Sequence, residues 1–441
     1  MKKADLTPLT AVKPHARQVQ WQNLEYYNAI YFGLNTFTGK DSGDGTVSVS
    51  KFKLKDAKIA DWVSLCKKSG SAGIIFTAKH SDGFCLFNSK YTDYTVMHSP
   101  YGKDMVAELA EECRRQNIKF GVRLSLLNRH EKCFGSAEYN DFFVNQLTEL
   151  LTNYGAICEV ILDSNTPDHK LDKAQEYDFL RYQNTVRKLQ SNAIVSICGD
   201  DVRPVGMQLL HAREQEWCVV DSDILSYSKQ KSMGKVSNAY PTLSSLDLGS
   251  REVALSAKEL VWCPAVCHIS ILNTGNYHGT TKEMISGVRT LEQLKNVYYS
   301  TVGNNVNLVI NVPPTKSGEI SQKVSDRLLE FASALQKDFS EEISARLIRY
   351  TNPKGETVYD ITPSKSGATK FVLREDIANG QLVEEFCIIA ETADKELVTV
   401  HSGFTIGAHT IISILNNHYV KYRLVITKSR AEVNNLKITI Y

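Results

Sequence analysis

The stretch Lys119–Asp163, KFGVRLSLLNRHEKCFGSAEYNDFFVNQLTELLTNYGAICEVILD, contains the pattern that decides the fold. It begins with an apolar run, Lys119–Leu127, and ends with another, Glu159–Asp163. Between them, apolar side chains recur at three- and four-residue steps from Tyr139 to Tyr154, which is the spacing of one helix face. A strand, a helix and a second strand in this order predict a βαβ unit with parallel strands.

The same alternation extends outward over about the first 340 residues. Several of the apolar runs are continuous, as in strands that are buried on both faces. Eight parallel strands with intervening helices predict a closed (β/α)8-type barrel, and we expect it to be irregular around the fifth and sixth strands, which lack a clear helix between them. The expected strands are residues 29–35, 72–78, 119–127, 159–163, 193–198, 216–221, 268–272 and 306–312. The expected helices are 56–68, one from Asp104 as its cap, 139–154, 174–189, 291–302 and 324–335.

The pattern changes near Ser344, where long helical periodicity stops. Short apolar runs separated by Gly, Asn, Asp and Pro predict an all-β sandwich domain. These runs are 345–350, 370–373, 383–390, 397–401, 410–415, 422–426 and 436–441. We therefore expect a barrel domain over residues 1–343 and a β-sandwich domain over 344–441.

The composition excludes several classes of protein. Basic and acidic residues nearly balance, 51 against 49, so no charge excess favours a nucleic acid or a membrane surface as a partner. No apolar run approaches about 18 residues, and Met1–Asp5 precedes no apolar segment, so neither a membrane span nor a signal peptide is predicted. The ten scattered cysteines favour free core thiols over a metal site or a disulfide framework. The oligomeric state stays open.

Polar residues that directly follow barrel strands are the candidates for chemistry, because active sites form at the carboxyl ends of such strands. After the second strand come Lys79, His80 and Asp82, a set suited to hydroxyl recognition, although an exposed loop with an Asp-Gly turn is the alternative. Asp163 ends the fourth strand and is either functional or paired with a base.

A retaining glycosidase needs a second carboxyl group about 5–5.5 Å from the first. The candidates near strands five and six are Asp200, Asp201, Glu214, Glu216 and Asp221, and the sequence does not choose among them. A phosphate-binding loop, a His-Glu-x-x-His segment and a Gly-x-Ser-x-Gly segment are absent, so phosphoryl transfer, zinc hydrolysis and serine esterase chemistry lose their usual signals.

From Trp21 to Tyr441 the chain resembles the α-L-fucosidase family, glycoside hydrolase family 29, and most of all its bacterial α-1,3/1,4-fucosidase branch. The motifs that carry the resemblance are Tyr31–Gly39, Thr77–Phe84, Ser89–Thr92, Gln146–Gly155, Trp262–Ala265, Val302–Asn305, Asn311–Pro314, Phe371–Ile377 with Gly380 and Gln381, and Gly403–Gly407.

The resemblance implies a barrel and a sandwich, retaining hydrolysis of a glycan or small glycoside, and no metal or cofactor. It assigns the nucleophile to Asp163, in agreement with the residue-based candidate. It also suggests a periplasmic or secreted protein. The expected substrate-binding residues are Tyr31, Lys79, His80, Asp82, Asn165, Trp217 and His268.

Several positions depart from the family pattern. The family's acid/base Glu aligns with Gln208, whose amide cannot transfer a proton, and loss of that help typically costs about 10²–10⁴-fold in rate. Glu214 or Glu216 could replace it. Further departures are Tyr31, Asp41 with Ser42, Ser81, Ser164, Val266 and Leu272. Two hypotheses follow: a glycosidase with altered specificity, or a catalytically impaired relative that binds glycans at the barrel mouth.

Overall fold

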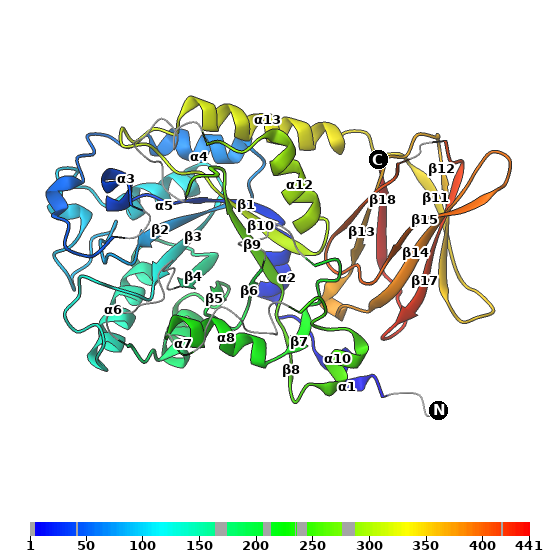
Figure 1. Ribbon diagram of the computed structural model, residues 1–441, viewed down its shortest axis with the longest axis horizontal. Coiled ribbons are helices and arrows are strands. Elements are labelled where there is room, and N and C mark those ends of the chain that lie inside the picture. The colour runs from blue at the N-terminus through cyan, green and yellow to red at the C-terminus, as the bar shows by residue number, and fades with distance from the viewer. Residues whose placement is uncertain are drawn as a thin grey trace.

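The computed structural model describes residues 5–40, 43–163, 174–205, 213–233, 235, 245–275, 287–415 and 418–441. Eight strands form one parallel sheet in the order β5-β4-β3-β2-β1-β10-β9-β6 (Figure 1). A parallel bridge from Ser196 to Val202 brings its two edges together, so the barrel is nearly closed. The barrel strands are β1 Tyr26–Ile30, β2 Gly73–Lys79, β3 Lys119–Ser125, β4 Glu159–Asp163, β5 Ile194–Ile197, β6 Arg203–Pro204, β9 Ala265–Ser270 and β10 Val306–Asn311.

Helices surround this sheet (Figure 1). The expected cap is confirmed, since the Asp104 side chain accepts a hydrogen bond from the Ala107 amide at 2.9 Å. None of the described helices is long and apolar enough to cross a membrane. The helices are α1 Thr7–Ala11, α2 Ala16–Gln22, α3 Leu34–Thr38, α4 Ile59–Lys68, α5 Met105–Arg115, α6 Glu138–Asn153, α7 Phe179–Leu189, α8 Asp223–Ser232, α10 Arg251–Ser256, α12 Leu291–Thr301 and α13 Gln322–Asp338, with the 3-10 turns η1 Val49–Lys51, η2 Val96–His98 and η3 Ile377–Asn379.

The sixth barrel strand is not the one that the sequence predicts. The run 216–221 contributes β7, Val219–Asp221, which pairs antiparallel with β8, Leu260–Trp262, outside the barrel. The barrel position belongs to β6, which has only two residues and gives no apolar run to detect. As expected, the barrel is irregular here, because no helix separates β5 from β6.

Alternation along the strands separates the barrel interior from the helix layer. Even-numbered residues of β3 and β4, such as Val122 and Val160, pack against the helices. The opposite parity faces inward. The interior core consists of Trp21, Tyr27, Ala29, Tyr31, Ile75, Ile161, Ile194, Val202, Val266 and Val309. The inward residues that follow this core on β3 and β4, Arg123 and Asp163, therefore lie toward the barrel mouth.

The C-terminal domain is a sandwich of two antiparallel sheets, as the sequence predicts. Their strand orders are β11-β12-β17-β14-β15 and β16-β13-β18. The strand β12 was not predicted because Asp360 interrupts its apolar pattern. The last barrel helix ends at Asp338 and the first sandwich strand begins at Ala345, while the division at 343/344 stays a prediction. The strands are β11 Ala345–Thr351, β12 Thr357–Pro363, β13 Lys370–Glu375, β14 Val383–Glu391, β15 Leu397–Gly403, β16 Thr410–Ser413, β17 Lys421–Ser429 and β18 Leu436–Ile440.

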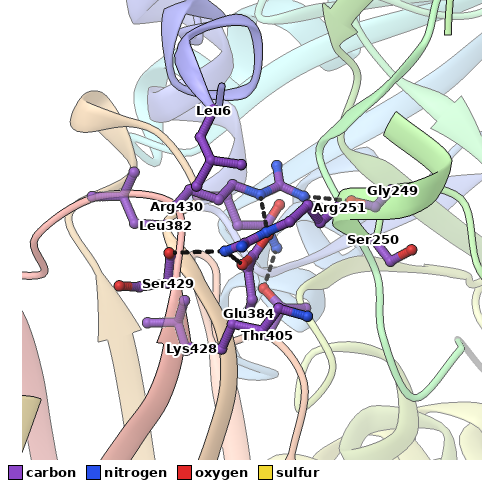
Figure 2. A network of polar contacts seen from close by, with 12 residues as sticks. Leu6, Gly249, Ser250, Arg251, Leu382, Glu384, Thr405, Lys428, Ser429 and Arg430 are labelled. Atoms are coloured by element: carbon purple, nitrogen blue, oxygen red, sulfur yellow. Dashed lines mark hydrogen bonds and ion pairs between the residues drawn. The ribbon is translucent and has the colours of Figure 1, made fainter. Parts of the chain in front are cut away.

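Buried charges join the two domains (Figure 2). Glu384 of the sandwich accepts hydrogen bonds from Arg251 of the barrel and from Arg430. Arg430 also donates to the Gly249 carbonyl and lies 4.3 Å over the ring of Trp217. Since Arg430 and Glu384 are both buried, removal of either would leave the other as an unpaired buried charge, which is unfavourable. This network holds Trp217, Gly249 and Arg251 of the barrel domain against the sandwich.

Candidate active site

A carboxylate and a guanidinium lie together at the barrel mouth. The Nε atom of Arg123, on β3, donates to Oδ2 of Asp163, at the end of β4, over 2.9 Å. The Arg123 side chain is 0% exposed and that of Asp163 13%. An unpaired charge at either position would be costly to bury, so the pair forms where two adjacent strands present opposite charges inward.

Tyr31 adjoins this pair. Its ring centroid lies 4.7 Å from Cζ of Arg123, a cation–π distance. Its amide donates to Oδ1 of Asn311, at the end of β10, over 3.0 Å. The pKa of the Tyr31 hydroxyl is raised, mainly because the group is buried. The charge of Arg123 opposes this shift and that of Asp163 adds to it. The phenol therefore stays protonated and can donate a hydrogen bond.

Two imidazoles share the same surroundings. Burial lowers the pKa of His80 well below its usual value, and the charges of Arg123 and Arg129 lower it further. Burial, followed by the charge of Arg123, lowers the pKa of His268 to about 3. Both rings are neutral at pH 7, so each offers one donor and one acceptor. His80 Nδ1 lies 3.3 Å from the Asn35 amide nitrogen.

The mouth contains buried polar atoms that the described part of the chain leaves without a hydrogen-bond partner. They are Thr77 Oγ1, Ser125 Oγ, Asp163 Oδ1 and His268 Nε2. Ser125 is the register partner of Asp163 across β3 and β4. Leaving such atoms unsatisfied typically costs about 1–3 kcal/mol each, so a polyhydroxylated ligand would gain by binding here.

Arg123, Thr77 and Ser125 were not predicted as site residues. A signal existed for Arg123, because a charged residue inside the apolar run KFGVRLSLL must find a buried partner. Nothing in the sequence indicated the Thr77 and Ser125 hydroxyls, since Thr and Ser are common in strands.

Lys79 lies away from the mouth. The pairing of β2 with β3 shifts between Thr77 and Lys79, so that Lys79 aligns with the outward-facing Leu124. Its amine donates to Oε1 of Gln146, on α6, over 3.0 Å. Three α6 rings surround it at 5.1–5.9 Å: Tyr139, Phe142 and Phe143. One bulge therefore turns a predicted sugar-binding residue into the helix layer.

Burial lowers the pKa of Lys79 from 10.5 to about 8. Between these pH values the unfolded chain keeps a proton that the folded chain has lost, so stability rises with pH. We expect wild type to gain roughly 2 kcal/mol between pH 7 and pH 10 that Lys79→Met does not gain. Urea unfolding at both pH values measures this, with exposed Lys119→Met as the control. Parallel pH curves for wild type and Lys79→Met would contradict the assignment.

Asp82 shapes the loop after β2. Its Oδ1 accepts from the Phe84 amide at 3.0 Å, and burial raises its pKa to about 6. A Cβ at Gly43 would lie 2.8 Å from the Asp82 Cβ, so the loop containing Gly43 covers this side chain. A direct role of Asp82 in sugar binding stays a prediction.

Most candidates for the second carboxyl group are bound elsewhere. Glu216 is 1% exposed, and its two oxygens accept from Arg203 at 2.6 Å and from Arg213 at 2.7 Å. Asp201 pairs with Arg17 and Arg187, Asp200 pairs with Lys229, and Asp221 accepts from the Asp223 amide. Glu214 is exposed and is the carboxyl group that remains available among them.

Trp217 belongs to the domain interface rather than to the mouth. Its ring is 1% exposed beneath Arg430, and its carbonyl accepts from Arg203 at 2.9 Å. Gly249 packs against the same ring, where any Cβ would clash. The remaining two predicted residues, Asn165 and Gln208, lie outside the described residues.

A parallel barrel with a carboxylate and buried polar groups at the carboxyl ends of its strands is the arrangement that barrel glycosidases use. The Alpha-L-fucosidase family model matches residues 5–231, just over half of the chain. The chain is 30% identical to Alpha-L-fucosidase 1 of Arabidopsis thaliana over 455 residues, which cover 95% of this chain and 85% of that protein. It therefore belongs to the α-L-fucosidase family, glycoside hydrolase family 29.

Solved structures agree with this assignment. A Bacteroides ovatus protein assigned as an α-L-fucosidase has a TM-score of 0.88 at 34% identity, with 100% of this chain and 76% of that one covered. A Ruminococcus gnavus GH29 fucosidase in complex with fucose has a TM-score of 0.81 at 24% identity, with 98% and 95% covered. At the second identity the likeness supports the fold alone.

Proposed function

We propose that this chain is a retaining glycoside hydrolase of fucosyl or closely related glycans, with Asp163 as its nucleophile and an altered specificity. The observation that carries the proposal is the position of Asp163: it ends β4 inside the mouth, beside buried hydroxyl and imidazole atoms without protein partners among the described residues. A relative in the same family binds fucose, which suggests the sugar.

The reaction has two steps. The Asp163 carboxylate attacks the anomeric carbon, the bond to the leaving oxygen breaks, and a glycosyl ester forms on Asp163. Water then attacks the same carbon and frees the carboxylate, so the configuration is retained. Neutral His80 and His268, with the Thr77 and Ser125 hydroxyls, bind the hydroxyl groups of the sugar. Glu214 is the candidate that gives a proton to the leaving oxygen in the first step and takes one from the attacking water in the second.

A second candidate function is glycan binding without turnover. The observation that favours it is the Arg123–Asp163 pair, because a carboxylate that already shares its charge with a guanidinium is a weaker nucleophile. The sequestration of Glu216 between two arginines favours it as well.

A panel of aryl α- and β-glycosides, including 4-nitrophenyl α-L-fucoside, separates the two functions. The hydrolase releases phenol from at least one of them, and proton NMR shows that the first sugar product has the configuration of the substrate. If no glycoside is cleaved while fucose or a fucosylated oligosaccharide binds in calorimetry, the binding function replaces the proposal.

Gln208→Glu tests the position that the resemblance aligns with the acid/base. We expect the variant to cleave fucosides with poor leaving groups about 10-fold to 100-fold faster than wild type, because a carboxyl group can protonate the leaving oxygen. Activated aryl fucosides need little protonation and should change less. Equal rates on poor leaving groups would contradict the alignment, and Gln20→Glu, at an exposed position of α2, serves as the control.

A further inference from the structure

We propose that Arg123 is the positioning residue of the nucleophile and that it selects Oδ1 of Asp163 as the attacking oxygen. The inference rests on the proposed function, and it concerns a residue that no sequence motif of the site contains. It follows from the contacts of the two carboxylate oxygens, which differ.

The two oxygens of Asp163 have different environments. Oδ2 accepts from Arg123 Nε at 2.9 Å. Oδ1 is buried and accepts no hydrogen bond from the residues that the structure describes. An oxygen that shares its charge with a guanidinium is the poorer nucleophile, so attack through Oδ1 is favoured. Rotation about the Cβ–Cγ bond would exchange the two oxygens, and the contact with Arg123 opposes it.

Arg123 is itself held firmly enough to act in this way. Its side chain is 0% exposed, and its guanidinium lies 4.7 Å from the ring centroid of Tyr31. Its strand position aligns with Thr77 of β2, and the next inward residue, Ser125, aligns with Asp163 of β4. Packing and register thus fix the donor, and a fixed donor orients the carboxylate.

The covalent half-reaction can be tested without a proton donor. In 2-deoxy-2-fluoro-α-L-fucosyl fluoride the leaving group is fluoride, which departs with the electrons of the C1–F bond as the C1–Oδ1 ester bond forms. The second fluorine slows hydrolysis of that ester. Peptide mass spectrometry then shows whether the label is on Asp163, and its time course gives kinact and KI.

The variants are Arg123→Met, which removes the guanidinium, and Arg123→Lys, which keeps the charge but loses the planar donor. Arg187→Lys is the matched control, because Arg187 lies on α7 and its partly buried pair with Asp201 is away from the mouth. All rates are expressed per folded protein, determined by circular dichroism and size-exclusion chromatography.

We expect Arg123→Met to lower kinact about 10²-fold with KI little changed, the cost of a nucleophile misplaced by about 1 Å. The kinact of Arg123→Lys should lie between those of Arg123→Met and wild type, and the kinact of Arg187→Lys should equal that of wild type. If wild type is labelled at Asp163 and both Arg123 variants are labelled at least as fast as wild type, the inference is wrong while the proposed function stands. If wild type is never labelled at Asp163, the proposed function fails and the inference fails with it.

A second readout does not depend on turnover. Burial, and after it the charge of Arg123, lowers the pKa of His268 to about 3, so Arg123→Met should raise that pKa, whereas Arg187→Lys should not. NMR titration of the His268 ring measures this. An unchanged His268 titration in Arg123→Met would place the guanidinium elsewhere and overturn the geometry behind the inference.

Discussion

Asp163→Asn is expected to lower kcat on an activated aryl fucoside by roughly 10⁴-fold or more, because removal of one catalytic side chain from a hydrolase costs on the order of 10⁴- to 10⁶-fold. An amide has no negative charge to form the glycosyl ester and cannot stabilise the developing positive charge at the anomeric carbon. The amide still fits the site and can accept from Arg123, so KM should change far less than kcat.

Rescue and a control make this expectation specific. In Asp163→Gly, azide can enter the space left by the carboxylate and attack the anomeric carbon, giving a fucosyl azide of inverted configuration. Asp221→Asn, at the end of β7, is the control because the Asp221 side chain accepts a hydrogen bond from the Asp223 backbone amide and lies outside the barrel. Hydrolysis by Asp163→Asn at the rate of wild type would exclude Asp163 as the nucleophile.

Glu216→Gln is expected to destabilise the protein by about 3–5 kcal/mol, the usual cost of removing one partner from a buried ion pair. Glu216 lies between Arg203 and Arg213, and Arg203 is itself only 2% exposed, so the variant leaves a buried guanidinium without its counter-charge. Urea unfolding at neutral pH measures the loss. The kcat of the folded fraction should stay unchanged, because this carboxyl group does not reach the mouth.

The matched variant is Glu214→Gln, two residues away and exposed. We expect no measurable change in the free energy of unfolding, since an exposed carboxyl group contributes little. If Glu214 supplies the proton, kcat on poor leaving groups falls. A loss of kcat in Glu216→Gln without a loss of stability would reverse the roles of the two residues.

The sequence alone determined the architecture and several candidate residues of the site, Asp163 and His80 among them. Apolar runs such as Glu159–Asp163 and helical periodicity such as that of α6 reflect local burial patterns, so they are visible without coordinates. The change to short apolar runs after Ser344 predicted the sandwich for the same reason. Asp163 could be named because burying a carboxylate at the end of an apolar strand costs free energy unless the group is paired with a base or serves a function.

Only the tertiary structure decided where the other polar side chains lie. A one-residue bulge after Thr77 turned Lys79 into the helix layer. Glu216 is held between Arg203 and Arg213, and Trp217 joins the domain interface beneath Arg430, which is distant in sequence. Arg123 entered the site because its strand register sets it beside Asp163. Such contacts depend on register and on long-range charge pairing, and neither leaves a local mark in the order of residues.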